Sequence, residues 1–292
     1  MEKPGIVLAP YGSLYPQALA TYKQIRAAYE REFPGSRVQL AFTSRLMIKR
    51  LFENEGISIP GPLATLAELR EMGYRSAVIQ SLQVVPGEEF HELAKLVQAL
   101  NGAGGKLGFE HLEIGLPLLS ALEDCKRVSS VLPTVWKGDS LNGEGRDNPT
   151  DQEKEATLLV GHGTGHPADS LYSLMAQVLK RDHTNVFLGT LEGFPGQLEL
   201  VAELKGMGPG TKKVRLLPFL LVAGGHAEKD IAGDDTTSWK STLIREGFKV
   251  ETQLRGLGES HEIVSIFIEH TRIALEKVEN RGQPLNRVRS KK

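Results

Sequence analysis

The sequence predicts an α/β protein of two similar lobes, each built on a parallel β-sheet that helices flank. Short apolar runs rich in β-forming residues alternate along the chain with longer amphipathic segments. This alternation is typical of βαβ units. The same landmarks then occur a second time in the same order. A length of 292 residues suits two domains of ordinary size.

Eight apolar runs are predicted as strands, and the clearest amphipathic segments between them as helices. Each run is short and lies near glycine, proline or polar residues, as strands do. The predicted strands are residues 5–9, 37–42, 76–85, 111–114, 157–160, 185–189, 213–222 and 248–253. The predicted helices are residues 15–32, 62–72 and 89–100.

Three segments of the first half resemble three segments of the second half. In the first pair, both members read as a strand followed by a glycine turn. Because the three matches keep one order, they indicate two similar lobes and an old duplication. The pairs are residues 5–13 with 157–164, 76–89 with 213–226, and 115–120 with 256–260.

The stretch between the halves carries almost no apolar residues and is rich in Gly, Asn, Asp and Pro. This composition is typical of a linker or an exposed loop. The C-terminal tail is basic, and we expect it to be solvated and frayed. The expected organisation is an N-terminal lobe over residues 1–136, a linker over 137–155, a C-terminal lobe over 156–280 and a basic tail over 281–292.

Composition narrows the class of protein. Hydrophobic residues make up 40% and charged residues 24%, a globular balance. The net charge of −1 gives no global attraction for nucleic acid or a membrane surface. The single cysteine, Cys125, excludes a disulfide framework and a cysteine-based metal site, and we expect it to be buried. The sequence shows no run of 18 apolar residues and no signal-peptide pattern, so we expect a cytoplasmic protein.

Histidines and carboxylates follow several of the predicted strands. His162, Glu192 and His226 each follow a strand of the second half, and Glu89 follows a strand of the first. Ligands of open parallel sheets bind outside the carboxyl ends of the strands. Imidazole and carboxylate together suit a divalent first-row metal such as Co, Ni, Fe or Zn, and they also serve as general bases. The alternative is that these loop residues only cap helices; two histidines and a glutamate in one half favour a site.

Two familiar nucleotide motifs fail. Residues 161–166 begin like G-x-G-x-x-G, but His166 replaces the third glycine. Residues 206–213 are rich in glycine, yet their spacing is wrong for a phosphate-binding loop and they precede a strand. We therefore expect no ATP and no nucleotide cofactor.

Other conspicuous residues have structural interpretations. Trp239 is predicted to pack at the start of a helix that Ser238 could cap. His270 is expected at a surface or helix position and not as a ligand.

Taken together, these motifs resemble one family, the anaerobic sirohydrochlorin cobaltochelatases. These are class II chelatases, which insert Co²⁺ into sirohydrochlorin in cobalamin biosynthesis. The resemblance covers nearly the whole chain except the linker and the basic tail, and the combination of motifs is specific. The matching stretches are residues 42–48, 79–82 with 87–89, 115–120, 161–163 with His166, 217–227, 234–235 with 238–240, and 256–259.

The resemblance implies a two-lobed chelatase fold with the tetrapyrrole held in a cleft between the lobes. It implies metal binding by His162, Glu192 and His226. It places Glu89 of the other lobe near the metal path, and it assigns catalysis to His162, His226 and Glu89. The residues expected to contact the tetrapyrrole are Tyr11, Gly12, Ser13, Gly163 and Gly225.

The implied reaction is ATP-independent insertion of Co²⁺ into sirohydrochlorin with release of two protons. A chelatase that inserts Fe²⁺ or Ni²⁺ into a related tetrapyrrole is an alternative. The ligand set does not distinguish these ions from Co²⁺, because their affinity order is set largely by their own chemistry. Two other classes stay open: a non-catalytic tetrapyrrole-binding or metal-binding protein, and a dinucleotide-dependent enzyme. The sequence also leaves open the oligomeric state, a homo-oligomer included, and the lobe on which the last helix packs.

Overall fold

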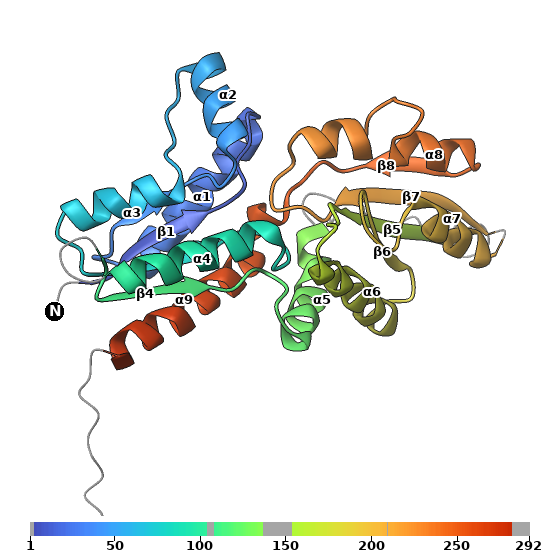
Figure 1. Ribbon diagram of the computed structural model, residues 1–292. Coiled ribbons are helices and arrows are strands. Elements are labelled where there is room, and N and C mark those ends of the chain that lie inside the picture. The colour runs from blue at the N-terminus through green and yellow to red at the C-terminus, as the bar shows by residue number, and fades with distance from the viewer. Residues whose placement is uncertain (1–2, 104–107, 137–153, 209, 282–292) are drawn as a thin grey trace, which may run out of the picture.

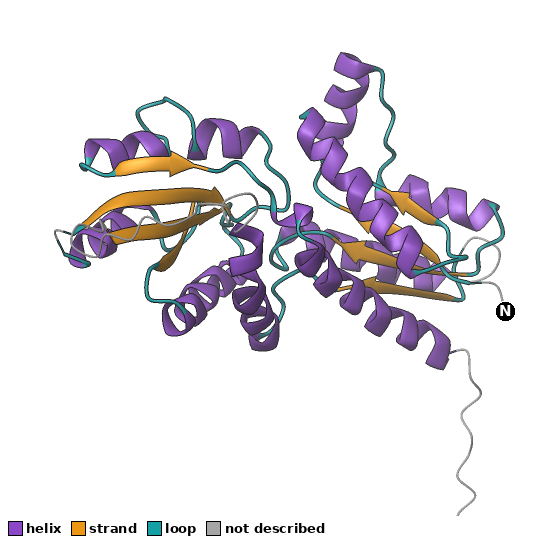
Figure 2. Ribbon diagram, turned by 180° about the vertical axis from the view of Figure 1, so that it is seen from behind, coloured by secondary structure: helices purple, strands orange, loops and turns teal. Residues whose placement is uncertain are grey.

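The computed structural model of the protein describes residues 3–103, 108–136, 154–208 and 210–281. The predicted linker, apart from its last two residues, and the predicted basic tail, apart from Arg281, lie outside these ranges. Two four-stranded sheets, each entirely parallel, form side by side in the described chain, and helices surround both (Figures 1 and 2). The predicted α/β fold of two parallel sheets is confirmed.

All eight predicted strands are present. The first sheet contains β1 (Gly5–Ala9), β2 (Val38–Leu40), β3 (Ser76–Ser81) and β4 (His111–Gly115); the second contains β5 (Lys154–Gly161), β6 (Val186–Thr190), β7 (Thr211–Pro218) and β8 (Lys249–Thr252). The helices are α1 (Pro16–Glu32), α2 (Arg45–Glu55), α3 (Pro62–Glu71), α4 (Glu88–Ala103), α5 (Leu122–Trp136), α6 (Ser170–Asp182), α7 (Gln197–Gly206), α8 (Trp239–Arg245) and α9 (His261–Arg281).

Two strands, β3 and β7, end about four residues earlier than predicted. The apolar runs at 76–85 and 213–222 were expected to be strands throughout, but β3 ends at Ser81 and β7 at Pro218. The apolar residues beyond them, such as Leu82 and Phe219, are buried in a core that both lobes share. Burial between the lobes, and not sheet pairing, is therefore the reason that these loops are apolar.

The two sheets have the same topology. Their strand orders are β2-β1-β3-β4 and β6-β5-β7-β8, so each element of one sheet has a counterpart in the other. This identity agrees with the repeats found in the sequence. In each sheet the chain order reverses between the two central strands, and such a switch point is where open α/β sheets bind ligands.

Side chains on one face of each sheet form a common core. Ile6 and Leu8 of β1 lie in the same buried cluster as Leu159 of β5, because side chains alternate between the two faces of a strand. Val7 faces the opposite side of the first sheet, and Leu158 faces the opposite side of the second; each lies in a separate cluster. The lobes are thus joined by packed apolar side chains.

The last helix crosses to the first lobe. Helix α9 follows the last strand of the second sheet but packs against β3 and β4 of the first (Figure 1). Its Thr271 hydroxyl contacts Tyr29 Oη at 3.1 Å and donates to Gln80 Oε1 at 2.8 Å, and all three side chains are buried. The packing of this helix, which the sequence left open, is thereby settled.

Two local predictions are confirmed. Trp239 is buried at the start of α8, and Ser238 Oγ accepts the Ser241 N–H at 3.1 Å as the helix N-cap. Cys125 is fully buried in the shared core, and burial raises the pKa of its thiol to about 11. No helix in the described part of the chain is long and apolar enough to cross a bilayer.

Candidate metal centre

The carboxyl edges of the two sheets face each other. At Gly225, which follows β7, a Cβ would lie 3.3 Å from the Tyr15 ring, which follows β1. On the other side, the rings of His91 and His166 have centroids 4.7 Å apart, one from α4 and the other from the loop after β5. The loops that follow the central strands of both lobes therefore meet.

The loops that carry the three predicted ligands lie at neighbouring strand ends of the second sheet. His162 follows β5, Glu192 follows β6, and His226 stands at the start of the short π-helical segment η2 (Ala227–Ile231) after β7. Since β5 lies between β6 and β7 in the sheet, the ends of these strands are adjacent. The backbone continues this pairing past the strands, because the N–H of Glu192 donates to the carbonyl of His162 at 2.9 Å.

The two histidines point their Nε2 atoms at each other. These atoms are 3.3 Å apart, and the rings are nearly perpendicular at 86°. Nδ1 of His162 lies 3.0 Å from the carbonyl of Gly163, and Nδ1 of His226 lies 2.7 Å from Asp230 Oδ2. Both partners of Nδ1 are acceptors, so in the neutral rings each Nδ1 carries the proton and each Nε2 presents a lone pair.

Two converging lone pairs repel each other unless a cation stands between them. In a tetrahedral site with metal–nitrogen bonds of ordinary length, two ligand nitrogens are separated by roughly 3.3 Å. The observed Nε2–Nε2 distance therefore suits two ligands of one metal ion. The side chains are half exposed, 40% for His162 and 52% for His226, so an ion can reach them.

Glu192 stands on the other side of the His162 ring. Its Oε2 lies 3.8 Å from Nδ1, and its side chain is 63% exposed. Within the described residues, no three His, Cys, Asp or Glu side chains are gathered in a ready metal-binding group. Glu192 must rotate to complete a set with the two Nε2 atoms, and its exposure leaves it free to do so.

Glu89 is near this junction but does not touch the three residues. It lies half-buried in the first turn of α4, between Gly87 and His91. Gly87 lies beside Thr164, and the His91 ring contacts the His166 ring. Both neighbours of Glu89 therefore approach the loop that follows His162. Among the described residues, no hydrogen bond or ion pair joins Glu89 to His162, Glu192 or His226.

The residues predicted to contact substrate lie on the same loops. Tyr11 is 49% exposed, whereas Ser13 is buried and its Oγ accepts the N–H of Tyr15. Gly12 has a φ of 112°, and a Cβ there would lie 2.6 Å from the Phe42 ring. Gly12 and Ser13 therefore shape the turn after β1, and Tyr11 is the residue of this turn that offers a free side chain.

Gly163 fixes the distance between the loops of His162 and Glu192. Its φ is 80°, and a Cβ there would lie 2.5 Å from the backbone nitrogen of Gly193. We expect Gly163→Ala to lower the free energy of unfolding by at least about 1–2 kcal/mol, the cost of left-handed backbone in a residue with a Cβ. Thermal and urea unfolding measure this loss.

Gly165→Ala in the same loop is the matched control. A Cβ at Gly165 meets nothing within 4 Å. Equal stability of the two variants would contradict the packing role of Gly163.

Asp230 is a residue of this site that the sequence analysis missed. Asp230 follows His226 by four residues, and residues four apart lie on the same side of a helical turn. An acid four residues after a candidate ligand was the signal that could have identified it.

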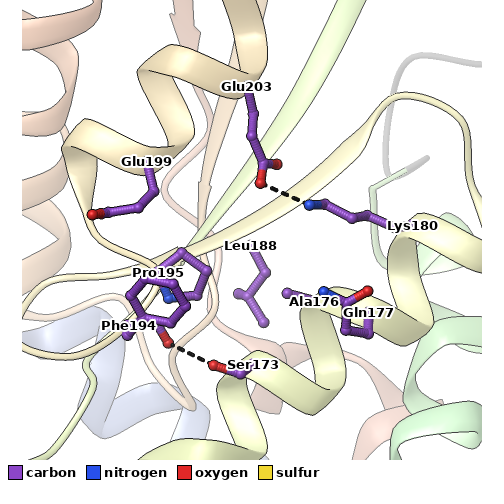
Figure 3. A pocket seen from close by; sticks show the side chains of 9 residues that line it. All are labelled: Ser173, Ala176, Gln177, Lys180, Leu188, Phe194, Pro195, Glu199 and Glu203. Carbon is purple, nitrogen blue, oxygen red and sulfur yellow. Dashed lines mark hydrogen bonds and ion pairs between the residues drawn. The ribbon is translucent and has the colours of Figure 1, made fainter. Parts of the chain in front are cut away.

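A small pocket is lined by side chains of the second lobe, including Phe194, Pro195 and Glu199 (Figure 3). It has a volume of about 150 Å³ and lies between α6, α7 and the peptide Phe194–Pro195. Ser173 donates to the carbonyl of Phe194, and Lys180 pairs with Glu203 at 2.7 Å (Figure 3). The pocket contains none of the three predicted ligands.

Comparison with known proteins now identifies the family. The model of the cobalt chelatase family (CbiK) matches residues 4–276. The chain belongs to the cobalt chelatases. Its members are metal-chelating enzymes, and the family resemblance inferred from the motifs is confirmed.

Two curated relatives cover nearly all of this chelatase. The sirohydrochlorin cobaltochelatase CbiKC of Nitratidesulfovibrio vulgaris is 32% identical over 284 residues, with 96% of this chain and 93% of the relative covered. The sirohydrochlorin cobaltochelatase of Salmonella typhimurium is 30% identical over 277 residues, with 94% and 97% covered.

A solved structure shows the same fold. SirB from Bacillus subtilis with Fe³⁺ matches this chelatase with a TM-score of 0.62 at 14% identity, covering 95% of this chain and 98% of its own. The two-lobed chelatase fold implied by the sequence resemblance is therefore confirmed.

Proposed function

We propose that this chelatase inserts Co²⁺ into sirohydrochlorin, releasing two protons and using no ATP. Its family and the names of its two curated relatives support the metal and the tetrapyrrole. The observation that carries the proposal is the convergence of the Nε2 lone pairs of His162 and His226 at the junction of the lobes. Two lone pairs at this distance form an electron-rich site for one cation.

The histidines receive the substrate metal. Two neutral imidazoles and one carboxylate can hold Co²⁺ with coordination positions left open for the nitrogens of the macrocycle. Glu192 completes the set after rotating from its position beside Nδ1 of His162. Partial exposure of the three side chains lets the ion shed water and pass from protein ligands to the ring.

The junction of the lobes positions the macrocycle. Loops from both sheets meet there, so a planar tetrapyrrole placed between them contacts both lobes at once. Tyr11 offers an exposed aromatic side chain from the first lobe, and Gly163 and Gly225 belong to the loops that follow β5 and β7 of the second. Holding metal and ring in one orientation removes much of the entropic cost of their encounter.

Two pyrrole protons must leave as the metal enters. Glu89 belongs to the first lobe, and its neighbours Gly87 and His91 lie beside the loop that follows His162. We assign it to accept the two pyrrole protons one after the other and to release each to water, because the imidazoles cannot bind the metal and a proton with the same lone pair. A general base of this kind contributes about 100-fold or more to the rate.

We expect Glu89→Gln to reduce kcat about 100-fold and to leave the dissociation constant for Co²⁺ unchanged, since proton acceptance is lost and metal ligation is not. Insertion kinetics and a Co²⁺ titration measure the two quantities. Glu88→Gln is the control, because Glu88 is an exposed acid in the same turn. Weaker Co²⁺ binding in Glu89→Gln would instead make Glu89 a ligand.

The function is tested with purified protein, sirohydrochlorin and Co²⁺ under anaerobic conditions. The visible spectrum of the tetrapyrrole reports insertion, and we expect a rate far above that of a protein-free reaction. Parallel reactions with Fe²⁺ and Ni²⁺ determine the preferred metal. Binding of the tetrapyrrole without accelerated insertion of any metal would reject the chelatase and indicate a carrier protein.

A further inference from the structure

His226 has a carboxylate partner that no motif or family assignment includes. Asp230 Oδ2 lies 2.7 Å from Nδ1 of His226, and both side chains are 52% exposed. The π-helical segment η2 presents both residues on one side, with the N–H of Ala232 donating to the carbonyl of Ala227 at 3.0 Å. In the corresponding position, Nδ1 of His162 has the neutral carbonyl of Gly163 at hydrogen-bond distance, whereas the nearest carboxylate oxygen, of Glu192, is farther away at 3.8 Å.

The partner of Nδ1 decides which nitrogen of a neutral imidazole carries the proton. With Asp230 as acceptor, the proton stays on Nδ1 and the lone pair of Nε2 faces His162. Without Asp230, the proton can move to Nε2. At 3.3 Å from Nε2 of His162, it would then form a hydrogen bond between the two histidines and occupy the space between them.

We propose that Asp230 is a positioning residue that keeps the metal-free pair of His162 and His226 open. It holds His226 in the tautomer whose Nε2 can accept a metal ion, and its negative charge increases the electron-donating strength of that nitrogen. This inference rests on the proposed metal site. It predicts the tautomer of His226 in the metal-free protein and the affinity of the protein for Co²⁺.

The metal-free protein provides the first test. Long-range ¹H–¹⁵N correlation spectra at about pH 8, where imidazole is neutral, report the tautomer of each histidine. We expect the Nδ1–H form for His226 in the wild type and a shift toward the Nε2–H form in Asp230→Ala. Asp230→Asn retains an acceptor oxygen and should retain the wild-type tautomer.

Titration with Co²⁺ alone provides the second test, followed by the visible absorption of the bound ion. Loss of a hydrogen-bond partner behind a ligating histidine weakens metal binding about 10–100-fold. We expect this loss in Asp230→Ala and a smaller one in Asp230→Asn. Glu228→Gln is the matched control, since Glu228 is an exposed acid on the same segment.

The outcomes separate this inference from the proposed site. If Asp230→Ala keeps the wild-type tautomer of His226 and binds Co²⁺ with a dissociation constant within twofold of the wild type, Asp230 has no positioning role. If His226→Ala also binds Co²⁺ like the wild type, the metal site itself is wrong. Because Asp230 is half exposed, its replacement should leave thermal unfolding unchanged, and the unfolding curve checks this directly.

Discussion

Replacing either converging histidine, by His162→Ala or His226→Ala, is expected to reduce Co²⁺ insertion into sirohydrochlorin to the protein-free rate. Each variant removes one of the two Nε2 lone pairs that lie 3.3 Å apart, and a single imidazole cannot hold the ion between the lobes. Removal of a direct ligand should weaken Co²⁺ binding more than the 10–100-fold typical of a partner behind it. The visible spectrum of the tetrapyrrole and a Co²⁺ titration measure both effects.

These variants should fold normally. Both rings are half exposed and belong to loops, so no core contact is lost with them. His261→Ala, at the exposed start of α9, is the control for a histidine outside the site. Wild-type insertion by the double variant His162→Ala/His226→Ala would eliminate the proposed metal centre.

The second large effect is expected on the free energy of unfolding, at the buried pair formed by His270 of α9 and Asp124 at the start of α5. His270 is only 6% exposed; its Nε2 lies 3.1 Å from Asp124 Oδ1 and its Nδ1 lies 3.0 Å from the carbonyl of Leu116. Both ring nitrogens therefore face acceptors, and the ring lies between the Leu116 carbonyl and the Asp124 carboxylate. His270 lies in a helix, which was one of the two expected positions, but its burial and its Asp124 partner were not predicted.

We expect His270→Ala to lower the free energy of unfolding by about 3–5 kcal/mol, because the buried Asp124 carboxylate then keeps only the N–H groups of Ser120 and Ala121 as partners. Urea unfolding measures the loss. Glu269 is adjacent to His270 and forms an exposed ion pair with Arg272. Glu269→Gln breaks only this pair and should lower the free energy of unfolding by less than about 1 kcal/mol. Equal losses in the two variants would contradict a special role for His270.

The same pair predicts how stability depends on pH. Burial by itself would raise the pKa of Asp124, but its hydrogen bond and charge interaction with His270, together with the N–H groups of Ser120 and Ala121, outweigh burial. The pKa of this carboxyl therefore lies below its ordinary value of 3.8. As pH falls, the Asp124 carboxyl takes up a proton at a higher pH in the unfolded chain than in the folded chain. The stabilisation is therefore complete above the ordinary pKa of 3.8 and is lost as pH falls through the lower pKa of the folded protein.

Much of the fold could be predicted because its signals are local. The apolar runs that became β1 to β8 are short, and alternation with helices restricts them to parallel sheets. The largest errors in the bounds are at the ends of β3 and β7. The residues that follow these strands are apolar because they are buried between the lobes, not because they form strands. A run of apolar residues cannot distinguish these two environments.

By itself, the sequence determined that His162, Glu192 and His226 share one edge of a sheet, because the carboxyl ends of adjacent parallel strands meet there. It did not determine how their atoms face one another. The direction of the two Nε2 atoms, the link from Asp230 to His226 and the crossing of α9 to the first lobe were decided only by the tertiary structure. His162 lies 64 positions from His226, and Asp124 lies 146 positions from His270. The protonation and orientation of such pairs depend on the partner that folding supplies, and no local pattern contains that partner.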